Sequence, residues 1–180
     1  MSAKNWNQRA KKVHLLLLDV DGVLTDGRII YDSRGQEIKC FNIKDGQGIR
    51  LLQEAGLEVG ILSGRKSSAV KLRAKDLGIR ILRQDVQDKA KDLARILRQK
   101  KLKREQIGFV GDDLVDLPVF QCVGLASAVA DAAAEVKSQA HWITRMTGGK
   151  GAVREVCERI LKAQGKWSKV IQKYSQRDPV

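Results

Sequence analysis

The stretch from residue 15 to residue 27, LLLLDVDGVLTDG, constrains the fold of this chain more than any other. It opens with four leucines that end at a Gly-containing turn, which is typical of a strand buried on both faces of a parallel sheet. Side chains two residues apart in a strand point the same way. Asp19 and Asp21 therefore project together at the carboxyl end of this strand, where open α/β sheets bind ligands. Two carboxylates in one place repel each other, so either a cation lies beside them or they cap the turn.

Apolar runs and helical patterns alternate along the rest of the chain. The expected strands cover residues 13–19, 57–62, 79–82, 107–110, 123–126 and 141–143. The expected helices cover residues 45–55, 67–77, 88–99, 128–136 and 152–163. Strands that alternate with helices favour a parallel sheet with right-handed crossovers. We therefore predict an α/β fold built as a three-layer, Rossmann-like parallel sheet.

Two short alternating segments, residues 28–31 and 36–41, flank a Gly-containing turn and predict a β-hairpin. The hairpin, at about residues 27–42, interrupts the expected connection from the first strand to the first helix, so we interpret it as an insertion. A chain of 180 residues fits one domain with a sizeable core. We predict a mobile N-terminus over residues 1–12, a domain over residues 13–164 and a C-terminal tail over residues 165–180.

The net charge of +13 leaves three interpretations open. Nucleic-acid binding is one, but no aromatic residue lies within the basic cluster at residues 95–104. We favour solvated helix faces, and a third interpretation is that positive potential attracts an anionic substrate. No apolar run reaches the ~18 residues of a membrane helix, and we see no secretory signal. Three scattered cysteines, Cys40, Cys122 and Cys157, fit a reducing cytoplasm.

Three further motifs follow the DVDG of residues 19–22 in chain order. They are SGR at residues 63–65 after an apolar strand, Lys89 at the start of a helical pattern, and GDDLVD at residues 111–116 after another strand. This order resembles the four signature motifs of the haloacid dehalogenase superfamily of phosphotransferases, over residues 13–163. The longer stretches DVDGVLTDG, LSGR, GDDLVDLP and GGKGAVRE are similar to a narrower branch that hydrolyses a sugar acid phosphate in lipopolysaccharide synthesis.

The resemblance implies a role for each motif residue. Asp19 would be the nucleophile that forms an aspartyl-phosphate, and Asp21 would act as general acid and then as general base. Mg²⁺ would be the cofactor, because it is a hard cation that takes oxygen ligands. Its protein ligands would be the carboxylates of Asp19 and Asp112 and the main-chain carbonyl of Asp21.

The remaining motif residues would support this centre. Asp113 would hold metal-bound waters or ligate more distantly. Ser63 and Lys89 would hold the phosphoryl oxygens, by a hydroxyl donor and a point charge. Asp116 would orient Lys89 through an ion pair. Taken alone, Lys89 is equally well a surface lysine of a helix.

Substrate choice and assembly are less constrained. The gaps at residues 27–45 and 65–89 are too short for the cap domain that closes the site in most relatives, so we expect none. The resemblance implies a homotetramer whose subunits cover one another's open sites. Arg65 is our candidate for binding a substrate carboxylate, in preference to capping a helix start. Lys44 and Lys150 are weaker candidates for substrate contact.

The tail carries one apolar helical stripe, formed by Trp167, Val170, Ile171 and Tyr174. We expect this stripe to pack either on its own domain or on a neighbouring subunit, where the tail would complete the neighbour's site.

These observations predict a magnesium-dependent phosphatase for an anionic sugar acid phosphate. One alternative is a phosphatase of the same mechanism that acts on another small sugar phosphate. The other is a basic scaffold that binds nucleic acid or a protein partner. The complete set of motif residues argues against a scaffold without catalysis.

Overall fold

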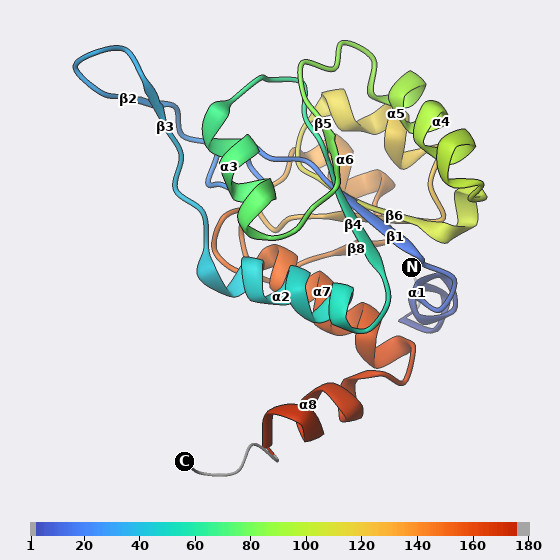
Figure 1. Cartoon of the computed structure of the whole chain (residues 1–180). Coiled ribbons are helices and arrows are strands. Elements are labelled where there is room, and N and C mark those ends of the chain that lie inside the picture. Colours follow the sequence, from blue (N-terminus) through green and yellow to red (C-terminus); the bar gives the residue numbers. More distant parts are fainter. Residues whose placement is uncertain (1–2, 176–180) are drawn as a thin grey trace.

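The computed structural model describes residues 3–175, and these residues form a six-stranded sheet in the order β5-β4-β1-β6-β7-β8 (Figure 1). All neighbouring strands of this sheet are parallel. The bounds are β1 (Leu15–Leu18), β4 (Glu58–Leu62), β5 (Ile81–Arg83), β6 (Ile107–Gly111), β7 (Leu125–Ala128) and β8 (Trp142–Ile143). The predicted α/β fold with a parallel sheet is confirmed.

Helices cover both faces of the sheet and complete the predicted three layers (Figure 1). On one face α2 packs on α7, α1 packs on α7, and α3 lies beside α2. On the other face α5 packs on both α4 and α6. The bounds are α1 (Ala3–Ala10), α2 (Ile43–Glu54), α3 (Ser68–Asp76), α4 (Lys89–Lys100), α5 (Leu117–Phe120), α6 (Ala134–Gln139) and α7 (Ala152–Ala163), with 3₁₀ turns η1 (Arg104–Gln106) and η2 (Leu114–Asp116).

Strand β1 lies in the middle of the sheet, between β4 and β6, because its four leucines are fully buried, at 0% exposure. The strand register places Leu18 beside Ile61 of β4 and beside Val110 of β6. The carboxyl ends of these three strands therefore lie side by side. The side chains that follow them, from Asp19, Ser63 and Asp112, share one edge of the sheet.

The predicted β-hairpin forms between β2 (Ile30–Tyr31) and β3 (Glu37–Ile38), with Ile30 opposite Ile38. It projects away from the body of the domain beside α3 (Figure 1). Residues two apart in a strand point the same way, so Glu37 and Lys39 share one face and Ile38 lies on the other. Within residues 3–175 there is no separate cap domain, as the short gaps predicted.

The prediction of a mobile N-terminus over residues 1–12 is wrong for the part that the structure describes. Residues 3–10 form helix α1, and Trp6 is buried at 2% exposure. Its ring makes an edge contact with Trp142, with centroids 5.6 Å apart. The guanidinium of Arg159 lies 4.4 Å from the Trp6 ring centroid and 4.3 Å from that of Trp142, so two cation–π contacts add to the apolar packing. A single buried tryptophan thus fixes a segment whose average composition is polar.

The tail forms helix α8 (Trp167–Ser175), which extends away from the sheet after α7 (Figure 1). The structure divides its apolar stripe in two. Trp167 and Val170 are half-buried and pack against the core of their own chain, whereas Ile171 and Tyr174 are exposed by 48% and 42%. Residues 176–180 of the predicted tail lie outside the described range. None of the described helices has both the length and the apolar composition to cross a membrane.

Candidate active site

Three carboxylates converge at the carboxyl ends of β1 and β6. Asp19 follows β1, Asp112 follows β6, and Asp116 ends η2. Carboxylate oxygens of the three lie within 4.8 Å of one another. The parallel strands cause this convergence, because neighbouring strands of the same direction present their last residues at one edge.

The ammonium of Lys89 lies between two of these carboxylates. Its Nζ is 3.0 Å from Asp19 Oδ1 and 2.7 Å from Asp116 Oδ1, and the side chain is 5% exposed. Asp88 accepts a hydrogen bond from Lys91 N and caps helix α4, so Lys89 occupies the first helical position and reaches into the site. The ion pair with Asp116 that the sequence suggested is present, and Lys89 is not a surface lysine.

Asp116 has a second contact that fixes the loop after β6. Its Oδ2 accepts a hydrogen bond from Asp112 N at 2.9 Å, and the residue is fully buried. One side chain therefore orients both Lys89 and the main chain that carries Asp112. Asp113, by contrast, is exposed, and its Oδ1 accepts from Leu114 N, so it caps η2.

Burial and crowding disfavour ionisation of two of the carboxylates. Burial raises the pKa of Asp19 to about 6, the charge of Asp116 adds to this effect, and the charge of Lys89 opposes it. Burial also raises the pKa of Asp112 to about 8, together with the charges of Asp19, Asp116 and Asp113. Asp112 Oδ1 is buried and has no hydrogen-bond partner among the described residues. An anionic, oxygen-only donor set with such an unpartnered oxygen fits a hard divalent cation such as Mg²⁺.

Asp21 lies nearer to solvent and contacts two cationic side chains instead of the metal cluster. Lys39 Nζ donates to Asp21 Oδ1, and Arg65 Nε lies 3.6 Å from Asp21 Oδ2. Sequence reasoning missed Lys39. The signal that could have found it is the order Glu37-Ile38-Lys39, because an apolar residue between two charged ones in a hairpin strand places both charges on one face.

Arg65 already has a carboxylate partner from the hairpin. Its Nη2 donates to Glu37 Oε1 at 2.6 Å, while its side chain remains 44% exposed. Ser63 is buried at the end of β4, and its Oγ accepts from Arg65 N at 3.3 Å. The turn that follows β4 therefore brings the hydroxyl and the guanidinium to the same edge of the sheet as Asp19.

Tight main-chain packing closes the base of the site. Gly22 has a φ of +85°, and a Cβ there would lie 2.0 Å from Asp112 Oδ2. A Cβ on Gly148 would lie 1.7 Å from the carbonyl oxygen of Gly22. The loop at residues 147–151 thus packs directly on the turn after Asp19, and only glycine allows this approach at these two positions.

The buried Asp45 ties this loop to helix α2. Its carboxylate accepts from Gly151 N at 3.2 Å and from Arg154 N at 2.8 Å, so it caps the start of α7. Sequence reasoning placed Asp45 only at a helix start. Lys44 and Lys150, the weaker substrate candidates, are both exposed on the two segments that Asp45 joins.

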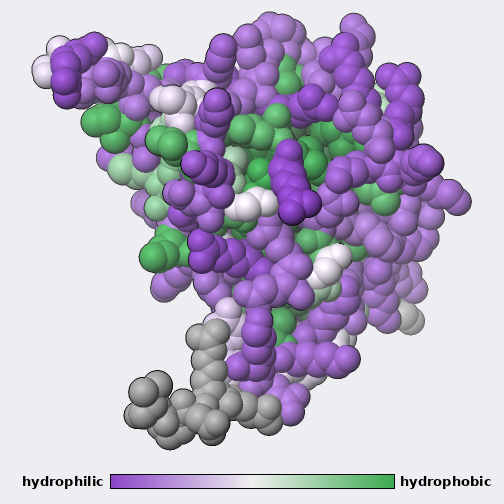
Figure 2. Space-filling model, viewed as in Figure 1, coloured by the Kyte–Doolittle hydropathy of each residue, from purple (hydrophilic) through white to green (hydrophobic). Residues whose placement is uncertain are grey.

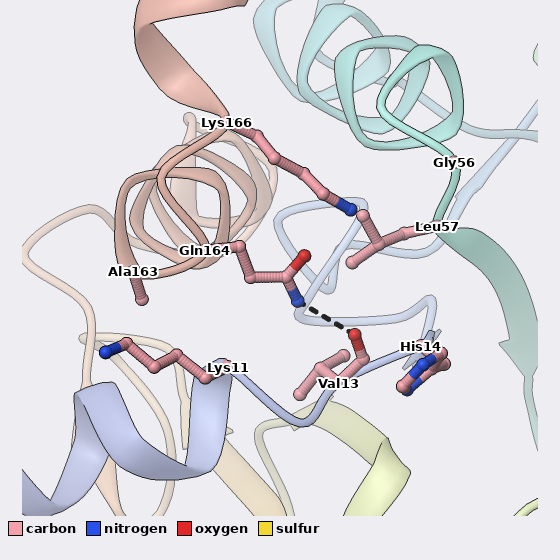
Figure 3. A pocket seen from close by; sticks show the side chains of 8 residues that line it. All are labelled: Lys11, Val13, His14, Gly56, Leu57, Ala163, Gln164 and Lys166. Atoms are coloured by element: carbon pink, nitrogen blue, oxygen red, sulfur yellow. Dashed lines mark hydrogen bonds between the residues drawn. The ribbon is translucent and has the colours of Figure 1, made fainter.

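A separate cavity of about 360 Å³ lies at the other end of β1 (Figure 3). It is lined by Lys11, Val13, His14, Gly56, Leu57, Ala163, Gln164 and Lys166. Gln164 Nε2 donates to the carbonyl of Val13 (Figure 3) and to that of Ala10, so this wall ties the segment before β1 to the end of α7. None of the predicted site residues lines it.

The basic cluster at residues 95–104 is partly neutralised by acidic neighbours. Arg95 pairs with Asp92, and Lys100 pairs with Glu58 from the sheet edge. These are the contacts of a solvated helix face, which is the interpretation that we favoured for the high net charge.

Comparison with known proteins agrees with this geometry. Residues 79–156 match the family model of haloacid dehalogenase-like hydrolases. The chain is 46% identical over 159 residues to the 3-deoxy-D-manno-octulosonate 8-phosphate phosphatase of Yersinia pestis, covering 88% of this chain and 85% of that protein.

Two solved structures also resemble this chain in fold. The Moraxella catarrhalis 3-deoxy-D-manno-octulosonate 8-phosphate phosphatase, in complex with magnesium, phosphate and KDO, superposes with a TM-score of 0.94 at 38% identity, covering 96% of this chain and 99% of that one. The cobalt-bound deoxy-D-mannose-octulosonate 8-phosphate phosphatase of Haemophilus influenzae gives a TM-score of 0.89 at 40% identity, covering 94% and 100%.

Buried carboxylates at the ends of β1 and β6, together with the buried lysine that begins α4, fit the class that the comparisons show, a phosphoric monoester hydrolase of the haloacid dehalogenase-like class. Within that class the chain belongs to the 3-deoxy-D-manno-octulosonate 8-phosphate phosphatase family.

Magnesium should stabilise the folded protein through Asp112. A cation that binds only the folded state raises the unfolding temperature, so we expect added Mg²⁺ to raise that of the wild type relative to EDTA. In Asp112→Asn the Mg²⁺ effect should nearly vanish. The metal-free variant should be no less stable than the metal-free wild type, because an amide replaces a carboxyl whose ionisation burial disfavours. Circular dichroism melts measure both quantities.

The control is Asp76→Asn, which removes an exposed carboxylate at the end of α3. It should respond to Mg²⁺ as the wild type does. Equal Mg²⁺ shifts in the wild type and in Asp112→Asn would contradict the assignment of the metal to this cluster.

Proposed function

We propose that this protein hydrolyses 3-deoxy-D-manno-octulosonate 8-phosphate to the free sugar acid and phosphate, in lipopolysaccharide precursor synthesis. The observation that carries the proposal is the position of Asp19. Its Oδ1 is 3.0 Å from the Lys89 ammonium, and its carboxylate is within 4.8 Å of that of Asp112. A nucleophile, a cationic phosphoryl-binding group and a metal ligand thus meet at one point.

The reaction divides into two displacements at phosphorus. Asp19 attacks, its oxygen forms a bond to phosphorus, and the ester bond breaks as Asp21 gives a proton to the leaving sugar oxygen. Water then attacks the aspartyl-phosphate, Asp21 accepts the proton of that water, and Asp19 is regenerated. Each step is a proton transfer or a displacement, so the chemistry needs no redox partner.

Lys89 and Ser63 hold the phosphoryl oxygens in this proposal. Burial disfavours the Lys89 ammonium, but the carboxylates of Asp19 and Asp116 outweigh it and raise the pKa of Lys89, so the group stays charged. Mg²⁺, held by Asp19, Asp112 and the main-chain carbonyl of Asp21, would neutralise the repulsion between carboxylate and phosphate. Asp113 would hold water molecules bound to the metal.

Arg65 selects the substrate by binding its carboxylate. The guanidinium is 44% exposed and lies beside Ser63, so a sugar acid whose phosphate sits at Ser63 can reach it. Its hydrogen bond to the carboxylate of Glu37 supports this role. Lys44 and Lys150 are exposed at the same end of the sheet and would attract the anion without fixing its orientation.

The reaction belongs in the cytoplasm, where the free thiols of Cys40, Cys122 and Cys157 stay reduced. There the basic surface would also draw an anionic sugar phosphate toward the site.

Phosphate release from a panel of sugar phosphates tests the proposed function. With Mg²⁺ the wild type should give a kcat/KM for 3-deoxy-D-manno-octulosonate 8-phosphate at least ~10-fold above those for aldose and ketose phosphates that lack a carboxylate. EDTA should abolish release, and Asp19→Asn should remain folded and inactive. A flat profile across the panel would instead support a phosphatase for another small sugar phosphate.

Arg65→Gln tests the selection of the carboxylate. Loss of a charge-assisted hydrogen bond costs about 1.5–3 kcal/mol, so kcat/KM for the sugar acid phosphate should fall by roughly 10- to 150-fold. Glutamine is preferable to glutamate here, because a third carboxylate beside Glu37 and Asp21 would add repulsion within the site. Hydrolysis of p-nitrophenyl phosphate is the control and should change by less than about threefold. Equal losses on both substrates would show that Arg65 does not read the carboxylate.

We also propose that four subunits assemble through the hairpin and α8. Hydrophilic side chains cover most of the face in Figure 2, and apolar side chains show both near the hairpin and in the middle of this face. In the hairpin region Ile29, Tyr31 and Ile38 are exposed by 53%, 60% and 47%. Ile171 adds an exposed apolar side chain on the tail, and the open site has no cap domain within residues 3–175.

A matched pair of substitutions on α8 tests this assembly. Ile171→Ser alters an exposed stripe position without disturbing Trp167 and Val170, which pack on their own domain. We expect light scattering to give the mass of four chains for the wild type and smaller species for Ile171→Ser, with kcat/KM for the sugar acid phosphate lower by about tenfold. Lys169→Ser, off the stripe on the same helix, should keep the mass. If Ile171→Ser keeps it too, the tail does not form the interface.

A further inference from the structure

The hairpin delivers a lysine into the site, although the fold has no cap domain in its described part. Lys39 follows β3, and only 1% of its side chain is exposed. Its Nζ donates to Asp21 Oδ1 and lies 3.3 Å from Glu37 Oε1. A buried ammonium is costly unless it is paired, so this lysine is held where it is by the two carboxylates that it contacts.

The two oxygens of Asp21 are in different situations. Oδ1 accepts from Lys39, whereas Oδ2 faces Arg65 Nε at 3.6 Å, which is longer than a hydrogen bond. An ammonium has only donors. Oδ1 is therefore fixed as an acceptor, and Oδ2 is the oxygen free to exchange a proton with a leaving group or a water.

We infer that Lys39 is a positioning residue that holds Asp21 Oδ1 so that Oδ2 is presented to the leaving oxygen of the substrate. This inference rests on the proposed function of Asp21 as general acid and base. It assigns the hairpin insertion a catalytic purpose beyond assembly. Lys39 acts through Asp21 and does not touch the phosphoryl group.

A substrate-binding role and a purely structural role both fit the geometry of Lys39 less well. A substrate-binding lysine must be accessible, and the exposed cation beside Asp21 is Arg65, at 44%, whereas Lys39 is almost fully covered. A purely structural role would make Lys39 a tether of the hairpin, since strands of two residues are marginal alone. With that role, substituting Lys39 should reduce kcat/KM equally for all leaving groups. An experiment that varies the leaving group therefore distinguishes a tether from a positioning residue.

The test compares substrates whose leaving groups need protonation to different degrees. The sugar acid is an alkoxide leaving group, so cleavage of its phosphate ester needs the proton of Asp21. The leaving group of 2,4-dinitrophenyl phosphate is a stable phenolate, which needs no proton. The quantity compared is kcat/KM, because it covers the steps up to formation of the aspartyl-phosphate and excludes the hydrolysis step that both substrates share. Lys39→Met removes the charge and keeps the length of the side chain.

We expect Lys39→Met to lose about 10²-fold in kcat/KM on the sugar acid phosphate, and less than about tenfold on the dinitrophenyl ester, as for a misplaced general acid. Lys39→Arg, which restores a donor to Oδ1, should recover at least about tenfold of the loss. The control is Lys71→Met, the same substitution at an exposed position of α3, which should leave both substrates within about twofold of wild type.

Equal losses on the two substrates, or no loss on either, would overturn the inference. Circular dichroism establishes whether each variant is folded. If Lys39→Met does not fold, Lys39→Gln is used in its place, with the same expected pattern of losses. Failure of the proposed function would give a different result, because the wild type itself would then not hydrolyse the sugar acid phosphate. The comparison is in that case made with the alkyl phosphate that the wild type hydrolyses fastest, and it still decides the role of Lys39.

Discussion

The repulsion among Asp19, Asp112 and Asp116 is the constraint on which the rest of the site depends. Strand β1 is buried on both sides, so the carboxylates at the ends of β1 and β6 lie where water screens them poorly. Lys89 offsets part of this charge, but burial still raises the pKa values of Asp19 and Asp112. A divalent cation bound at these carboxylates would relieve the remainder, so the charge of the cluster itself favours metal binding.

The hairpin supplies what a cap domain supplies elsewhere. It is short and carries exposed apolar side chains, yet it also brings Glu37 and Lys39 to Asp21 and Arg65. The resulting ring alternates two carboxylates with two cations, so it adds charged groups to the site without adding net charge. In the proposed mode of binding, a substrate carboxylate at Arg65 would compete with Glu37 for the guanidinium, so the hairpin would take part in substrate choice.

The sequence by itself determined the sheet and the residues at its edge. An all-leucine run favours a central strand, alternation of strands and helices favours parallel pairing, and parallel strands bring their carboxyl ends together. Local patterns placed Asp19, Ser63 and Asp112 at the ends of strands, whereas the position of Lys89 in the same site was expected only from the order of the four motifs in the resembling family. The Lys89–Asp116 ion pair was likewise expected from that resemblance, and the structure contains it.

Only the tertiary structure decided which side chains meet across loops. Lys39 and Glu37 contact Asp21 and Arg65 because the base of the hairpin lies beside the turn after β1, and no periodicity in the sequence specifies that placement. Helix α1 is ordered because Trp6 finds Trp142 and Arg159, which lie far along the chain. Asp45 joins α2 to α7 for the same reason. Local sequence encodes strands and helices through backbone and burial preferences, whereas contacts between distant loops depend on the packing of the whole chain.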